Sequence, residues 1–260
     1  MDARKSWLLA SMMALVLTMA CGGGGSDAPE EAMAPAAPAA APVDEATAGA
    51  VMGAVMLEGA PPEAETIRMN SDPVCAQETG DTTQTEYFVV GDDGSLANVF
   101  VYVKEGLGDR SFPAPTEPVL LDQNGCRYFP HVFGIQVGQT LQVRNGDPTL
   151  HNIHAMPATN SEFNTGQPIE GMTFDHEFTE VEVMVPFKCD VHSWMNAYVG
   201  VLPHPYYAVS GDGGAFDINS LPPGDYVIEA WHEKLGTQTQ NITVGESETV
   251  EISFTFTVST

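Results

Sequence analysis

Hydrophobic and polar positions alternate over short runs in most of the chain after residue 50. The clearest runs are Ala50 to Leu57 and Asn98 to Lys104, which are rich in β-branched and aromatic residues. Turn signals, an asparagine or aspartate followed by glycine, separate such runs at Asp93, Asn124 and Asp212. No window of helical length keeps a 3.6-residue hydrophobic period. Short strands joined by regular turns predict an all-β fold of sandwich architecture.

The first twenty residues have a different pattern, a short apolar run that follows positive charges. Arg4 and Lys5 precede an apolar run, residues 7–19, that is too short to span a bilayer. We therefore expect residues 1–20 to be an export signal peptide. The stretch that ends at Cys21 resembles a bacterial lipobox, which predicts lipidation of this cysteine. The alternative is ordinary cleavage, which would leave a free thiol.

Residues 21–49 are rich in glycine, alanine, proline and acidic residues and contain no aromatic residue. Such a segment buries too little apolar surface to fold, so we expect a disordered tether. Acyl chains on Cys21, not a transmembrane helix, would hold the protein to a membrane. These features predict an exported protein that is lipid-anchored to a bacterial membrane and faces the periplasm or the cell surface.

The residues with the clearest chemistry lie between Val185 and Met195. Cys189, His192 and Met195 have the spacing CxxHxxM, and about forty residues earlier the chain reads His-Asn-Ile-His at 151–154. A thiolate, two imidazoles and a weak thioether form the ligand set of a trigonal copper site. Taken singly, cysteine and methionine are more often core residues. Zinc can also occupy a site with such ligands.

The residues alone leave open which upstream histidine would bind. On a strand, His151 and His154 point to opposite faces, so both cannot easily reach one ion.

The CxxHxxM segment and the upstream histidines resemble the cupredoxins, which include amicyanin, pseudoazurin and plastocyanin. The short gap between histidine and methionine is most similar to amicyanin, and the resemblance extends over residues 119–203. It implies a Greek-key β-sandwich over residues 114–203 that holds one type 1 copper ion. In this family pattern the upstream ligand is the histidine followed directly by asparagine. The implied ligands are therefore His151, Cys189, His192 and Met195.

The same resemblance implies roles for residues beside the ligands. Asn152 fits a role in tying the two ligand loops together. Plastocyanin-like loops often have proline two residues after the cysteine, whereas this chain has Val191, whose free amide we expect to donate to the thiolate and raise the potential. His192 is expected to meet solvent as the electron exit. Trp194 is expected in an apolar docking patch, its alternative role being that of a loop anchor.

The four cysteines divide among three expected uses. With Cys21 assigned to lipid and Cys189 to copper, Cys75 and Cys126 remain. An exported chain lives where disulfides persist, so we predict a disulfide between these two that closes a loop of roughly 50 residues. The alternative is a second metal site that uses Cys126 with His131.

The C-terminal stretch resembles a second known module. Residues 216–218 and the LPPGDY segment at 221–226 are similar to a hairpin of the carboxypeptidase-regulatory-like β-sandwich, which is non-catalytic. Residues 204–260 are fewer than a full module, and residues 50–113 contain similar opening strands. We therefore predict a second small β-sandwich from these two segments, with the cupredoxin domain inserted between them. Alternatively, the N-terminal strands extend the cupredoxin sheet.

Net charge limits the partners. The full sequence has 9 basic and 35 acidic residues and a formal charge of −26. Without residues 1–20 the count is 7 against 34, a formal charge of −27. Nucleic acid is a poor partner for such a chain, and a basic redox protein is a good one. A basic cytochrome c or a membrane oxidase or reductase would fit, although a generally acidic surface is the alternative reading.

A copper ion held by four protein ligands exchanges one electron and has no open position for a substrate. We therefore expect a membrane-anchored type 1 copper protein that carries single electrons, and not an enzyme. The sequence also contains no nucleophile-elbow, P-loop or dinucleotide motif. The alternative function is a copper carrier or store that delivers metal to an oxidase.

Overall fold

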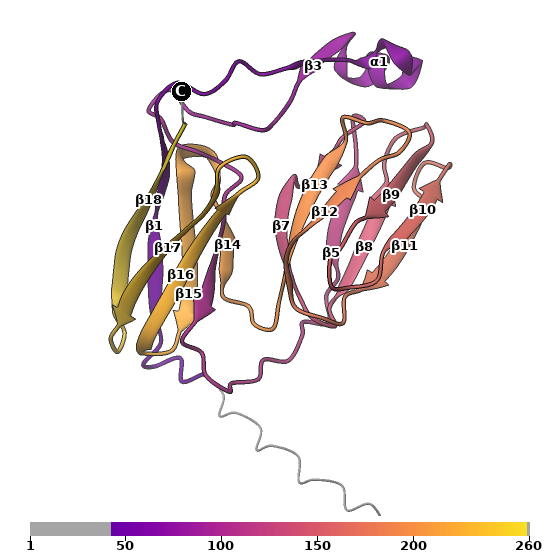
Figure 1. The fold of residues 1–260 in the computed structure, drawn as a ribbon. Coiled ribbons are helices and arrows are strands. Elements are labelled where there is room, and N and C mark those ends of the chain that lie inside the picture. Colours follow the sequence, from indigo (N-terminus) through magenta and orange to yellow (C-terminus); the bar gives the residue numbers. More distant parts are fainter. Residues whose placement is uncertain (1–42, 259–260) are drawn as a thin grey trace, which may run out of the picture. The chain divides into compact units, whose positions relative to one another are not determined.

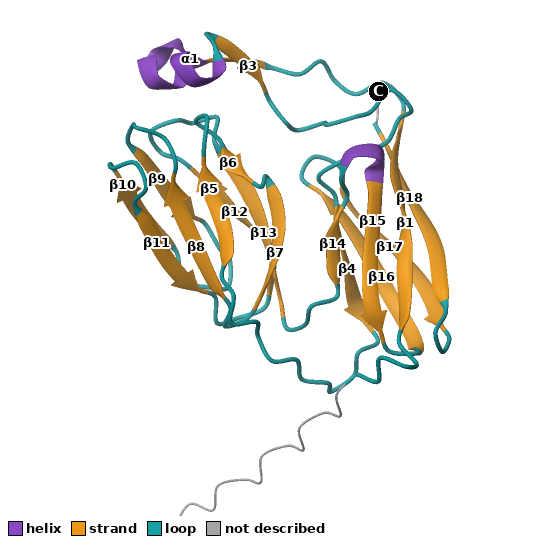
Figure 2. Cartoon of the chain, turned by 180° about the vertical axis from the view of Figure 1, so that it is seen from behind, coloured by secondary structure: helices purple, strands orange, loops and turns teal. Residues whose placement is uncertain are grey.

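The computed structural model describes residues 43–258, and strands make up nearly all of their regular structure (Figure 2). Helix occurs only at η1 (Met69–Ser71), α1 (Pro73–Thr79) and η2 (Asp212–Gly214) within these residues. The all-β prediction is therefore confirmed. The expected signal peptide and lipidated Cys21 lie outside the described residues, as does the tether up to residue 42. Between residues 43 and 258, no helix has the length and apolar character needed to cross a membrane.

One sandwich, here called the central sandwich, uses the continuous stretch 119–202 (Figure 1). Its two sheets have the strand orders β10-β9-β12-β13-β7 and β11-β8-β5-β6. Between them lies a core that includes Phe133, Phe178 and Phe187. The strands are β5 (Val119–Gln123), β6 (Tyr128–Phe129), β7 (Val132–Gln136), β8 (Thr140–Asn145), β9 (His151–Ala155), β10 (Phe163–Gln167), β11 (Thr173–Glu177), β12 (Glu182–Lys188) and β13 (Asn196–Leu202).

A second sandwich, here called the terminal sandwich, combines strands from both ends of the described chain. Its sheets have the orders β15-β1-β18 and β14-β4-β16-β17. Strand β1 runs parallel to β18, with Ala50 opposite Thr249. Val101, Ile228 and Phe254 lie in its buried core. The strands are β1 (Gly49–Glu58), β4 (Phe100–Glu105), β14 (Tyr207–Val209), β15 (Ala215–Leu221), β16 (Gly224–His232), β17 (Gly236–Val244) and β18 (Thr249–Thr257). The resemblance to a carboxypeptidase-regulatory-like module stays a prediction.

Strand β4 is buried on both faces, because its alternating side chains serve two cores. Val101 and Val103 belong to the core of the terminal sandwich, whereas Phe100 and Tyr102 cluster with Val132, Met184 and Leu202 of the central sandwich. The run Val-Phe-Val-Tyr-Val is therefore hydrophobic at every position, as expected for a strand covered on both sides.

Two glycines on neighbouring strands make this contact close. Gly134 in β7 is the partner of Gly200 in β13, and the rings of Tyr207 and Phe100 lie directly over these glycines. The two rings are stacked on one another with centroids 5.5 Å apart. A side chain at either glycine would occupy the space of a ring.

We expect Gly200→Ala to lower the free energy of unfolding by about 1–3 kcal/mol, the usual cost of overpacking. The added methyl would overlap the Phe100 ring, which is fully buried and cannot swing away. Urea unfolding of the variant measures the change. The control is Gly166→Ala in β10, where an added methyl meets nothing within 4 Å. Equal losses in the two variants would contradict the close contact.

Residues 66–84 form a separate element, here called the capping segment. Its short strands β2 (Thr66–Arg68) and β3 (Thr82–Gln84) pair with one another and enclose η1 and α1. Helix α1 begins where the Asp72 side chain accepts a hydrogen bond from the Val74 amide, with proline at the first helical position. The hydrophobic pattern predicted no helix here, because seven residues are too few to show a helical period.

Candidate metal centre

Four side chains converge at one end of the central sandwich. His151 is the first residue of β9, while Cys189, His192 and Met195 lie in the turn between β12 and β13. Strands β9 and β12 are paired neighbours. As a result, Cys189 Sγ and one ring nitrogen from each histidine lie within 4.8 Å of one another. Met195 is buried in the same core cluster as Cys189.

The turn from Cys189 to Met195 is closed by its own backbone. The Cys189 amide donates to the Met195 carbonyl at 3.1 Å, and the Met195 amide donates to the His192 carbonyl at 2.9 Å. Tyr128 braces the same region, since its hydroxyl donates to the Asn152 carbonyl at 2.5 Å and the Lys188 carbonyl at 3.0 Å. Hydrogen bonds of the protein itself thus hold the ligand turn next to strand β9.

The environment of Cys189 favours the thiolate. Burial alone would raise the pKa of its thiol, but hydrogen bonds from His151, His192 and backbone amides lower the pKa to about 6. The side chain is 1 % exposed. A buried sulfur that ionises near neutral pH is suited to bind a soft metal ion.

The outer nitrogen of His151 is bound to a carboxylate. The two histidines face one another through Nδ1, 2.9 Å apart, while His151 Nε2 lies 2.8 Å from Asp147 Oδ2. Asp147 also accepts the backbone amides of Gly125 and Cys126, each at 2.8 Å. Burial opposes its ionisation, but these hydrogen bonds lower the pKa of Asp147 overall. Asp147 therefore fixes the ring so that Nδ1 points into the site.

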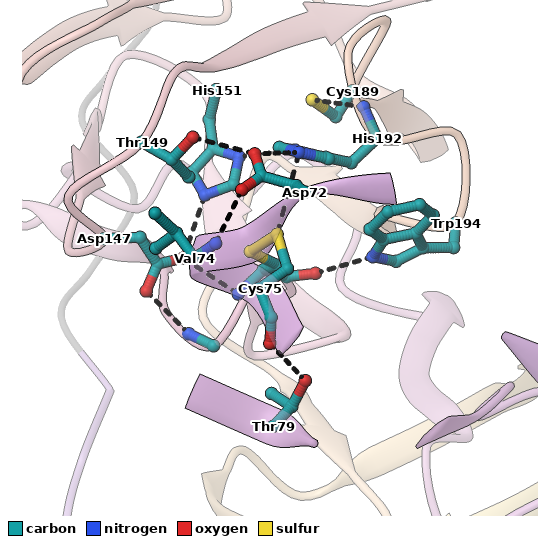
Figure 3. The surroundings of a disulfide bond; sticks show 12 residues. Asp72, Val74, Cys75, Thr79, Asp147, Thr149, His151, Cys189, His192 and Trp194 are labelled. Atoms are coloured by element: carbon teal, nitrogen blue, oxygen red, sulfur yellow. Dashed lines mark hydrogen bonds and ion pairs between the residues drawn. A yellow bond between two sulfur atoms is a disulfide. The ribbon is translucent and has the colours of Figure 1, made fainter. Parts of the chain in front are cut away.

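His192 is covered, which corrects the expectation that it meets solvent. The residue is only 3 % exposed, because the capping segment lies over it (Figure 3). Asp72 Oδ2 is 3.0 Å from His192 Nε2, and Cys75 Sγ is 3.6 Å from the same nitrogen. The predicted disulfide between Cys75 and Cys126 is present and holds α1 in this place.

His151 and His154 have opposite environments along β9. His154 is bound through Nδ1 to Asp190 at 3.0 Å and through Nε2 to Glu162 at 2.9 Å. Both of its nitrogens are thus occupied at the surface, away from the cluster that contains Cys189. Of the two histidines left open by the sequence, the structure brings His151 to the other ligands.

The side chain of Asn152 bridges the ligand strand and the ligand turn. Its Oδ1 accepts the Asp190 amide at 2.7 Å and lies 3.3 Å from Cys189 Sγ. Its Nδ2 donates to Asn164 Oδ1 at 2.8 Å.

The expected hydrogen bond from the Val191 amide to the thiolate is absent from the described residues. The amide of His192 donates to Cys189 Sγ instead, at 3.3 Å, and Val191 is 48 % exposed. The turn is closed by the hydrogen bond from the Met195 amide to the His192 carbonyl. In this geometry the amide of His192, and not that of Val191, points at Cys189 Sγ.

Trp194 makes the contacts of a loop anchor, the alternative role expected for it, and its place in an apolar docking patch stays a prediction. Its Nε1 donates to the Cys126 carbonyl at 3.0 Å, and its ring lies 5.0 Å from that of His192. The side chain is partly buried against the core. Trp194 therefore joins the ligand turn to the disulfide loop.

The alternative second metal site is excluded at Cys126, whose sulfur is in the disulfide. His131 is also engaged, since Nδ1 donates to the Asn196 carbonyl at 3.1 Å and Nε2 lies 2.5 Å from Glu233 Oε1.

Sequence reasoning missed both carboxylates that hold the histidines. Asp147 stands four residues before His151, a local spacing that could have suggested the contact. Asp72 precedes a proline, which is a helix-start signal, but it is 120 residues away from His192 in sequence. Nothing local could have assigned it to this site.

No protein-family model and no curated protein matches the chain. Among solved structures, a copper-containing nitrite reductase (NirK) from Thermus scotoductus SA-01 matches with 21% identity and a TM-score of 0.32, over 38% of this chain and 25% of the reductase. A point mutant of amicyanin in its oxidized state matches with 22% identity and a TM-score of 0.29, over 32% of this chain and 81% of amicyanin. A purple cupredoxin from Nitrosopumilus maritimus matches with 25% identity and a TM-score of 0.28, over 32% of this chain and 97% of that protein. These similarities are distant and cover about a third of this chain, and the first spans a quarter of the reductase.

Proposed function

We propose that the protein binds one copper ion in a type 1 site and carries single electrons. The observation that supports this most directly is the convergence of Cys189 Sγ with ring nitrogens of His151 and His192 in a buried site. Met195, buried in the same core cluster as Cys189, would supply the weak thioether ligand of such a site. When bound, copper would supply a one-electron couple between its cuprous and cupric states.

The residues present fit a copper ion in three respects. The thiol of Cys189 has a pKa lowered to about 6, so it is mostly ionised at neutral pH. Both imidazoles present Nδ1 to one another and have their outer nitrogens fixed by carboxylates. The site is closed by protein on every ligand, so it has no evident position for a substrate. This combination supports an electron carrier over an enzyme.

We further propose that lipidation at Cys21 anchors the protein to a bacterial membrane and that its partner is a basic redox protein. The formal charge of −27 that remains without residues 1–20 supports attraction to a basic surface. Acidic side chains are also exposed beside the site, where Asp190 and Glu162 are 40 % and 66 % exposed.

The visible spectrum tests the copper site. We expect the chain from Ser26 onward, loaded with copper and oxidised by ferricyanide, to show an intense band towards the red end of the visible range. Charge transfer from the Cys189 thiolate to cupric ion is the cause, so Cys189→Ser should abolish the band. His154→Ala is the matched control and should keep it, because His154 is bound to Asp190 and Glu162.

A colourless protein that holds cuprous ion against ferricyanide would favour the copper-delivery function instead. A protein that binds only zinc would contradict both.

A further inference from the structure

The capping segment is not part of either sheet of the central sandwich, yet it is fixed to that sandwich at several points. Met69 and Cys75 are fully buried in the central core. The disulfide joins Cys75 to Cys126. Arg127 adds two further contacts, donating at 2.6 Å to both Thr83 Oγ1 and the Gln84 carbonyl. Residues of this segment are therefore held in place over the site.

Of the capping segment, Asp72 approaches a ligand most closely, nearer to His192 Nε2 than Cys75 Sγ is (Figure 3). One carboxylate oxygen accepts the Val74 amide at 2.8 Å at the start of α1. The other accepts the Thr149 hydroxyl at 2.9 Å and lies 3.0 Å from His192 Nε2. The carboxylate is thus oriented by two partners, the Val74 amide and the Thr149 hydroxyl, that are independent of His192.

This contact determines what the other nitrogen of His192 can do. A carboxylate at Nε2 accepts the ring N–H, which leaves Nδ1 with a free lone pair. That lone pair faces His151 Nδ1 across 2.9 Å, at the centre of the cluster. A carboxylate partner also raises the basicity of an imidazole ligand. His151 has the same arrangement with Asp147, so each ligand histidine has its own carboxylate.

We propose that Asp72 is a positioning residue of the metal centre, which acts through His192 to fix the ring and favour the cupric over the cuprous state. The inference deepens the proposed copper function and rests on it. It is based on the contact between His192 Nε2 and a carboxylate of the capping segment, which lies outside the two sheets of the central sandwich. A more basic imidazole stabilises the higher metal charge more strongly, so Asp72 lowers the reduction potential.

The test compares Asp72→Asn and Asp72→Ser with the wild type. Asparagine and serine are both good helix N-caps, so α1 should still begin at the same residue. The negative charge that Asp72 places beside His192 Nε2 is removed. We expect cupric affinity to fall by about 10–100-fold, the usual loss when the outer partner of a ligand is removed. Cuprous affinity should fall about tenfold less, which raises the midpoint potential by about 59 mV. Equilibrium titrations with each ion and redox titration followed in the visible band provide these values.

Glu78→Gln is the matched control, since it removes a negative charge from the exposed face of the same helix. Its potential should stay at the wild-type value. Equal shifts in the Glu78 and Asp72 variants would overturn the inference and leave only a general effect of charge. So would Asp72 variants that keep both the wild-type potential and the wild-type ratio of affinities. A wild-type protein without the visible band would instead refute the proposed function, and the tuning with it.

Discussion

Replacing Cys75 and Cys126 together with alanine is expected to lower the free energy of unfolding by about 4 kcal/mol. The disulfide joins residues 51 apart, and a crosslink over a loop of that length removes entropy from the unfolded chain worth about this amount. The denaturant dependence should also become steeper, because an unfolded chain without the crosslink exposes more surface. Guanidinium unfolding of the metal-free protein measures both quantities.

The same double variant should also loosen the metal centre. Without the disulfide, α1 loses its covalent link to the loop at Cys126, and Asp72 loses the support that keeps it on His192. The potential of the copper form should therefore shift in the same direction as in Asp72→Asn.

In the unfolding experiment on the metal-free protein, Cys189→Ala, which removes the free buried thiol, is the control for loss of one sulfur. A stability loss no larger than in this control would show that the crosslink contributes little.

His131→Ala is expected to cost about 3–5 kcal/mol in the free energy of unfolding, because it leaves the buried carboxylate of Glu233 without its nearest hydrogen-bond partner. The side chains of His131 and Glu233 are only 7 % and 3 % exposed, and their atoms approach to 2.5 Å. The remaining partners of Glu233 are more distant, with the Tyr198 hydroxyl at 3.3 Å and Lys234 Nζ at 3.8 Å.

A double-mutant cycle distinguishes the pair from its parts. Replacing both His131 and Glu233 with leucine should cost much less than the sum of the single replacements, since no buried charge is then left alone. Chemical unfolding of the four proteins provides the coupling free energy. Additive losses would mean that the two side chains stabilise the fold independently. Because His131 also binds the Asn196 carbonyl, next to Met195, the pair links the terminal sandwich to the ligand turn.

Short-range patterns explain how much of the site could be anticipated. Cys189, His192 and Met195 occupy one turn, so their spacing in sequence is nearly their arrangement in space. The role of Asn152 could be predicted for the same reason, since this residue directly follows a candidate ligand. The hydrogen bond from the Val191 amide to the Cys189 thiolate was predicted by analogy with related loops. This prediction was wrong, because the direction of an amide depends on the path of the turn. The prediction that His192 is exposed to solvent was wrong, because a segment distant in sequence covers it.

By itself, the sequence determined the strand-rich class and the chemistry of the candidate ligands, because strand alternation and the spacing within one turn are local properties. Only the tertiary structure decided that His151 joins Cys189 while His154 binds surface carboxylates. It also decided that Asp72, 120 residues before His192, closes the site. Contacts of this kind depend on where the whole chain passes and on a disulfide that brings distant segments together. No local pattern of residues encodes them.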